Sequence, residues 1–268
     1  MAPLLIWQVM AFYSRDPDMD QHLSTLVTQL ERQGRIGRAC DLSITWLRCR
    51  ASPPERGPSF REQESPPPSP RGAHWQGDQL REPAGMVRLF YLVAAEAWLQ
   101  RGLIADEPEL RRALAGMAQL CSNDGTSLVV DLLSGTTSGP SLPGRRFEQW
   151  AGQRHLVNDW LASLGWPELA GTNVCQKPWG EGPYGRERDF HGPSLQNGNR
   201  LSADATARLL FSLMSDAIVS PPACRRLRHL ILRSAGPTVG MEPSGSGVDG
   251  LLGDPLPPEA SIVLRGGP

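Results

Sequence analysis

The residue types that could start nucleophilic chemistry are few, and their spacing is restrictive. A serine followed three residues later by a lysine places a hydroxyl and an amine one helical turn apart, where the amine can activate the hydroxyl. Lys177 is the only lysine in the chain, and the residue three positions before it is Val174. No serine is followed by an arginine at that spacing either. The sequence therefore contains neither a local serine–lysine pair nor its serine–arginine counterpart.

A second polar group lies in the run Cys121-Ser122-Asn123-Asp124, between two expected helices. A hydroxyl, an amide and a carboxylate in adjacent residues could contribute to a polar site. Ser122 is equally suited to cap the helix that we expect from Gly125, because a serine side chain accepts a backbone N–H at a helix start. The two roles are compatible.

Metal and cofactor chemistry finds little support in the sequence. The histidines are far apart and show neither H-x-x-x-H nor H-E-x-x-H spacing, so we expect no metal site and no cofactor. The cysteines are odd in number and form no C-x-x-C pair, so we expect buried thiols rather than disulfides. The histidines are His22, His74, His155, His191 and His229, and the cysteines are Cys40, Cys49, Cys121, Cys175 and Cys224.

The charge balance argues against nucleic-acid and membrane partners. The net charge is −1, which gives no electrostatic attraction to nucleic acid or to an anionic membrane. No apolar run reaches the ~18 residues of a membrane span. The apolar start, Met1 to Phe12, lacks a basic segment and a small-residue cleavage site, so we expect no signal peptide and, by default, a cytoplasmic protein.

Hydrophobic periodicity predicts a mostly helical chain with strands near both ends. The expected helices span 18–33, 86–100, 107–120, 125–133, 147–164, 202–215 and 221–234. The expected strands span 41–48 and 260–264. Residues 52–71 are dominated by Pro, Ser, Arg and Glu and should form a loop, as should the Gly- and Pro-rich residues 166–199.

This order predicts an α+β fold, in which a helical subdomain packs on an antiparallel sheet made from both chain ends. Along the chain we expect an N-terminal helix and first strand in residues 1–50. A Pro/Ser-rich loop or insertion follows in 51–81, and the main domain occupies 82–268.

Three stretches, taken in order, resemble the serine hydrolases of the class A β-lactamase and penicillin-binding family. The resemblance is greatest to a cyanobacterial branch of that family, and it covers Asp41 to Leu232. The stretches are GMVRLFYLVAAEAWLQRGLIADEPELRRAL, CSNDGTSLVVDLLSGTTSG and WLASLGWPELAGTNVCQKPWGEGPYGRER. The resemblance implies a β-lactamase-like fold and an ancestral acyl transfer on a β-lactam or a D-alanyl peptide amide.

The family's S-x-x-K motif falls on Gly85-Met86-Val87-Arg88 in this chain. Gly85 has no side chain, so no acyl-enzyme can form at that position. Arg88 keeps the positive charge but does not deprotonate near neutral pH, so it is a poor base. The resemblance therefore implies a site without its nucleophile.

The other family motifs are altered as well. Ser122 matches the serine of the S-x-N motif, and Asp124 stands where the family has its amide. Arg265, in Leu264-Arg265-Gly266, takes the lysine position of the K-T-G motif. In the family further strands and a helix follow this strand, so we expect a sheet that lacks its C-terminal strands.

Three further charged residues have simpler interpretations. Glu168 lies in a Pro-Glu-Leu string that resembles the family's loop glutamate, but we expect an exposed loop carboxylate. Lys177 is expected to be a surface lysine in a loop that could border the pocket. Glu187, between Arg186 and Arg188, is expected on a salt-bridged loop face.

The leading expectation is a catalytically inactive homologue of these hydrolases, either the product of a decaying gene or a protein retained for binding. One alternative is an active hydrolase that uses another serine, such as Ser122. The other is a non-catalytic module that binds a ligand or a partner. In that module Arg88 and Arg265 would hold the carboxylate of a β-lactam or a D-alanyl peptide.

Overall fold

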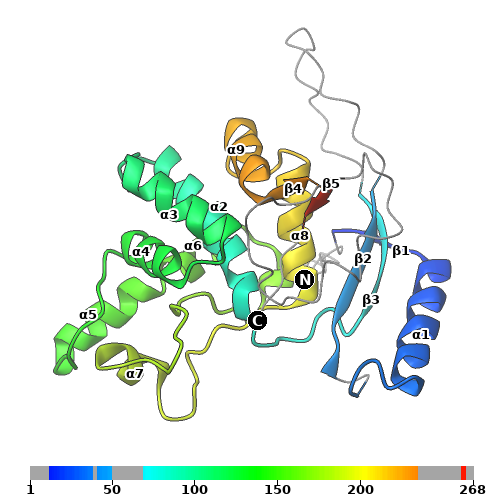
Figure 1. Ribbon diagram of the computed structural model, residues 1–268, viewed down its shortest axis with the longest axis horizontal. Helices are drawn as coiled ribbons and strands as arrows, with labels where there is room; N and C mark the ends of the chain where they lie inside the picture. The colour runs from blue at the N-terminus through cyan, green and yellow to red at the C-terminus, as the bar shows by residue number, and fades with distance from the viewer. Residues whose placement is uncertain (1–11, 39–40, 50–68, 235–260, 264–268) are drawn as a thin grey trace, which may run out of the picture.

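The computed structural model describes residues 12–38, 41–49, 69–234 and 261–263. A small sheet lies between helix α1 on its outer side and helix α8, which belongs to a larger helical part (Figure 1). The strands are β1 (Ser14–Arg15), β2 (Ile44–Arg48), β3 (Arg71–Trp75), β4 (Leu232–Ser234) and β5 (Ser261–Val263). The α-helices are α1 (Pro17–Arg32), α2 (Val87–Gln100), α3 (Pro108–Gln119), α4 (Asn123–Ser134), α5 (Gly144–Arg154), α6 (Leu156–Ser163), α7 (Arg186–His191), α8 (Ala203–Met214) and α9 (Pro221–Ile231), with 3-10 turns η2 (Ala84–Met86) and η3 (Pro167–Leu169).

Helix α1 follows local sequence signals closely. Asp16 caps its start by accepting the backbone N–H groups of Asp18 and Met19, and Pro17 occupies the first turn. Gly34, with a φ of +64°, follows the end of the helix, which is the position where a left-handed residue is favoured. The apolar side of α1 packs on β3, where Met19, Leu23 and Val27 of the helix are buried together with Ala73 of the strand.

The sheet differs from the expected one. Its strand order is β1-β3-β2, in which β1 and β3 run parallel and β2 and β3 run antiparallel. The C-terminal strand β5 pairs with β4 instead of joining these N-terminal strands. The prediction of one antiparallel sheet made from both chain ends is therefore wrong within the described ranges. Strand β4 continues directly from α9 and forms a separate two-stranded sheet with β5.

Helix α2 lies at the centre of the helical part. The sequence predicted an amphipathic helix with one apolar face, but every residue from Val87 to Trp98 is buried. Helices α3, α4 and α9 contact it directly. A helix enclosed on all sides must satisfy each of its polar side chains inside the protein.

Two other expected elements are refined by the structure. The single helix expected over 147–164 divides at His155 into α5 and α6. Strand β3 falls within the expected loop or insertion of residues 51–81.

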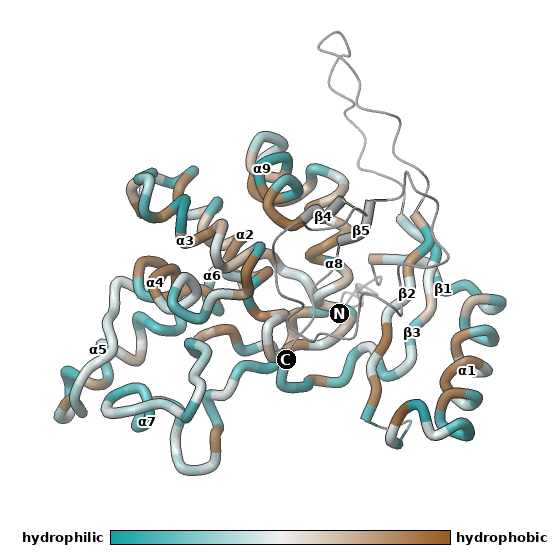
Figure 2. Tube along the Cα trace, in the orientation of Figure 1, coloured by the Kyte–Doolittle hydropathy of each residue, from teal (hydrophilic) through white to brown (hydrophobic). Residues whose placement is uncertain are grey.

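In Figure 2, α5 and α7 at the edge of the helical part are mostly hydrophilic or neutral, in keeping with their distance from α2.

A buried carboxylate joins three helices. Glu96 of α2 is fully buried, and its Oε1 accepts a hydrogen bond of 2.6 Å from Arg111 of α3. Its Oε2 accepts a second, also of 2.6 Å, from Arg226 of α9. The two guanidiniums belong to partly exposed side chains on neighbouring helices. Glu96 therefore holds α3 and α9 against α2.

The cysteines are divided between the interior and the surface. Cys175 and Cys224 are buried, as expected, and burial raises the pKa of the Cys175 thiol to about 12. Cys49 and Cys121 are exposed, so the expectation of buried thiols is wrong for these two. All four are free thiols, and Cys40 lies outside the described residues.

Among the helices of the described ranges, none combines the length and the apolar character needed to cross a membrane.

We expect Glu96→Gln to lower the free energy of unfolding by about 1–3 kcal/mol, because a neutral amide replaces the buried acceptor of two charged donors. Urea unfolding followed by circular dichroism measures this change. Glu109→Gln is the matched control, since Glu109 pairs with Arg112 on the exposed side of α3, and it should leave the midpoint unchanged. Equal midpoints for wild type and Glu96→Gln would contradict the role given to Glu96.

Candidate functional site

The start of α2 holds Gly85 and Arg88, the first pair of candidate site residues. The turn η2 leads into the helix, and Gly85 within it is buried. Ala84 adopts a φ of +43°, an unusual value for a residue with a side chain. Position 85 therefore offers no hydroxyl, and the turn brings the chain to Arg88 in the first turn of α2.

Arg88 connects α2 to the start of α4. Its Nη2 donates to Asn123 Oδ1 at 2.6 Å, and its Nε donates to Thr126 Oγ1 at 3.2 Å. Only 6% of Arg88 is exposed. The structure thus brings the first and second motif positions together, through a guanidinium held by two neutral oxygens.

Ser122 is the N-cap of α4. Its Oγ accepts the backbone N–H of Gly125 at 3.0 Å, and its carbonyl accepts the hydroxyl of Thr126 at 2.7 Å. A Cβ at Gly125 would lie 2.8 Å from the carbonyl of Ala113, so glycine permits the close approach of α4 to α3. The capping role considered for Ser122 is therefore observed.

The amide that faces Arg88 belongs to Asn123, not to Asp124. Asp124 is exposed in the first turn of α4. Asn123 is thus the described residue of this run that contacts Arg88 through its side chain. Cys121, just before the N-cap, has a left-handed conformation with a φ of +53°.

The remaining motif residues lie elsewhere. Arg265 lies outside the described residues, so the third motif is not placed. Glu168, in η3, pairs with Arg208 of α8 and accepts the backbone N–H of Phe12 at 3.3 Å. Its side chain is only 9% exposed, which corrects the expectation of an exposed loop carboxylate. Its two partners tie η3 to α8 and to the N-terminal segment.

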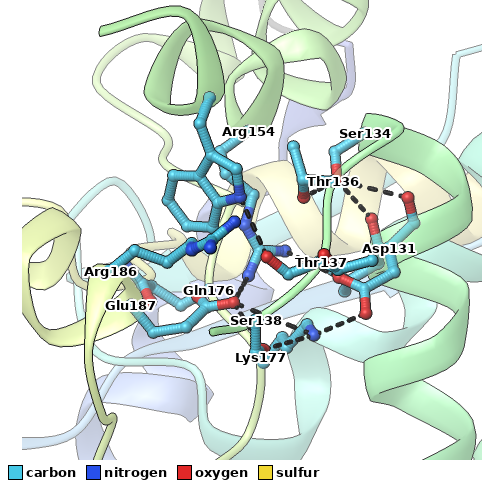
Figure 3. Close-up of polar contacts among 12 residues, drawn as sticks. Asp131, Ser134, Thr136, Thr137, Ser138, Arg154, Gln176, Lys177, Arg186 and Glu187 are labelled. Carbon is cyan, nitrogen blue, oxygen red and sulfur yellow. Dashed lines mark hydrogen bonds and ion pairs between the residues drawn. The ribbon is translucent and has the colours of Figure 1, made fainter. Parts of the chain in front are cut away.

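A buried polar cluster lies beside α4 and was not predicted (Figure 3). Lys177 Nζ donates to Asp131 Oδ2 at 2.7 Å and to Ser138 Oγ at 2.8 Å. Ser138 in turn donates to Glu187 Oε1 at 2.8 Å, and Arg154 pairs with the same carboxylate. We call these five residues the lysine cluster.

The lysine cluster overturns two expectations. Lys177 was expected at the surface, but its side chain is 5% exposed. Glu187 was expected on a salt-bridged loop face; it does pair with Arg154, but it lies in α7 and is fully buried. Burial raises the pKa of Asp131, although donation from Lys177 opposes that shift. Two cations and two carboxylates balance within the cluster, so its charge is neutral and it is best explained as a structural clamp.

No sequence signal short of the fold identifies the lysine cluster. Its members come from α4, the segment after α4, α5, the loop after η3, and α7. They are separated by up to 56 residues, as Asp131 and Glu187 show. The one hint in the sequence was that the only lysine of the chain is at position 177.

A histidine–carboxylate pair lies where the sheet meets α8. His74 of β3 and Thr45 of β2 are opposite each other in register, and both side chains hydrogen bond to Asp204 of α8. The distances are 2.8 Å for His74 Nδ1 and 2.7 Å for Thr45 Oγ1. This pair docks the sheet on the helical part. The described ranges hold no cluster of three or more residues suited to bind a metal ion.

Comparison with known proteins returns no match. No family model matches the chain, and no curated protein or solved structure is detectably similar to it.

We expect Lys177→Met to lower the free energy of unfolding by about 3–5 kcal/mol, because it leaves the buried Glu187 and the half-buried Asp131 with one cation between them. Chemical denaturation monitored by tryptophan fluorescence measures the loss. Arg188→Met is the control, since Arg188 is an exposed cation next to Glu187 in sequence. A loss no larger than that of the control would show that the lysine cluster does not clamp the fold.

Proposed function

We propose that this chain is a non-catalytic relative of the β-lactamase-type serine hydrolases that binds a β-lactam or a D-alanyl peptide without acylation. One observation carries the proposal. The position that would supply the nucleophile is Gly85, buried in the turn before α2, and the neighbouring motif position is a guanidinium. A glycine cannot form an acyl-enzyme, and loss of such a nucleophile removes several powers of ten in rate.

The polar contacts of this site also argue against Ser122 as a substitute nucleophile. An active serine needs a base within hydrogen-bond reach. Ser122 Oγ accepts from Gly125, and no described residue accepts its proton. Arg88 contacts the neighbouring Asn123, and a guanidinium is not a base at neutral pH. Glu168, the other candidate, is occupied by Arg208.

Retention for binding is favoured over simple decay by the order of the site. Arg88, Asn123 and Thr126 make short, directed hydrogen bonds across two helices. The glycine at position 125 keeps the close approach that aligns these helices. These features support an ordered arrangement of polar groups, which we take to serve non-covalent recognition in place of covalent chemistry.

Intact-mass spectrometry after incubation with a reactive penicillin tests the proposal. We expect the mass to be unchanged and a thermal melt of the same sample to be cooperative. The double variant Gly85→Ser/Arg88→Lys rebuilds the missing pair and is the matched comparison for capture of the same probe.

A mass increase of one acyl group in the wild-type chain would overturn the proposal. If that increase then disappears in Ser122→Ala, the chain is an active acyl-accepting enzyme that uses Ser122. The absence of any cooperative melt would also count against it, because a binding protein must fold.

A further inference from the structure

We propose that Arg88 recognises the free carboxylate of a small monoanionic ligand, an inference that rests on the non-covalent function proposed for the same site. The argument starts from charge. Arg88 is 94% removed from solvent relative to an exposed residue, since only 6% of it is accessible. Both of its hydrogen-bond partners, Asn123 and Thr126, are neutral.

Two arginines are buried in the described part of the chain, and Arg88 is the one without a carboxylate partner. The other, Arg154, pairs with Glu187, and the partly exposed Arg208 and Arg228 pair with Glu168 and Asp216. In the described part of the chain, no carboxylate lies within ion-pair distance of Arg88. A guanidinium taken out of water without a counter-charge costs several kcal/mol in stability, and natural proteins normally pair such a group.

The carboxylates of α2 and of the first turn of α4 do not neutralise it. Glu96 lies on the same helix but is held by Arg111 and Arg226. Asp124 is exposed on the first turn of α4 and forms no ion pair with Arg88. The positive charge at the start of α2 therefore stays uncompensated within the described ranges.

One edge of the guanidinium lacks a described partner. Nη2 of Arg88 donates to Asn123, which is exposed. Nη1 donates to no described residue, whereas Nη2 and Nε each have a partner. The Nη1 edge of Arg88 is therefore the edge that we assign to an incoming anion.

The charge of the site selects the ligand class. A single uncompensated cation is neutralised by one negative charge, which a carboxylate supplies. A planar carboxylate also matches the geometry of guanidinium N–H donors. A doubly charged phosphate would leave an excess negative charge. Asn123 beside the guanidinium offers its amide to the neutral part of the same ligand.

Thermal unfolding at constant ionic strength tests this inference with N-acetyl-D-alanine, and its amide serves as the uncharged control. We expect the acid to raise Tm in a saturable manner, by about 3 °C at ten times Kd. The amide should produce no shift, because it cannot neutralise Arg88.

Variants assign the effect to Arg88. Arg88→Gln should abolish the shift, whereas Arg88→Lys should keep it with an affinity about tenfold weaker. Arg228→Gln is the control at a paired, partly enclosed arginine, and it should respond to the acid as the wild type does. If Arg88→Gln fails to melt cooperatively, the Arg88→Lys titration decides, and an unweakened affinity there overturns the inference.

The remaining outcomes separate this inference from the function on which it rests. If the acid and the amide raise Tm equally, or if inorganic phosphate raises Tm as much as the acid does, carboxylate recognition is overturned. The absence of a penicillin adduct would still support the non-catalytic function. A penicillin adduct together with an acid-specific shift would instead remove the non-catalytic proposal and leave carboxylate recognition by Arg88 in place.

Discussion

The complete burial of α2 is the constraint on which the rest of the helical part depends. A helix with residues 87–98 inside the protein has no solvent face on which to place polar groups. Each polar side chain therefore recruits a neighbouring element. Glu96 recruits α3 and α9, Tyr91 donates to the carbonyl of Gln176, and Trp98 donates to the carbonyl of Leu133. At the N-terminal end of α2, Arg88 recruits α4.

The charged side chains that hold the fold together differ from Arg88, the charge that we propose binds a ligand. The lysine cluster balances its charges internally and clamps α4 to the loop after η3 and to α7, as the contacts in Figure 3 show. Glu168 and Arg208 do the same between η3 and α8. Of the two arginines buried in the described ranges, Arg154 pairs with a carboxylate and Arg88 is held by neutral oxygens only. The site proposed for ligand binding is thus a place where a buried cation has no described counter-charge.

How much the sequence could predict depended on how local each signal was. Helix α1 was predictable because Asp16, Pro17 and Gly34 define both of its ends locally. Strand β3 was missed because its short run, Arg71 to Trp75, directly follows a Pro-rich segment and has little alternation. Asn123 and Asp124 are adjacent polar residues, and only the position of Arg88 in the fold shows that Asn123 is the one it contacts. Burial of Lys177 depended on partners up to 46 residues away, which no spacing rule reveals.

The most direct test of the account is a crystal structure of the protein soaked with a penicillin. The account predicts an intact β-lactam ring, no bond to any side chain, and the ligand carboxylate within hydrogen-bond distance of Arg88 Nη1. Density continuous from an opened ring to Ser122, Cys121 or any other side chain would contradict the non-covalent function. An intact ligand bound away from Arg88 would contradict the role given to that charge.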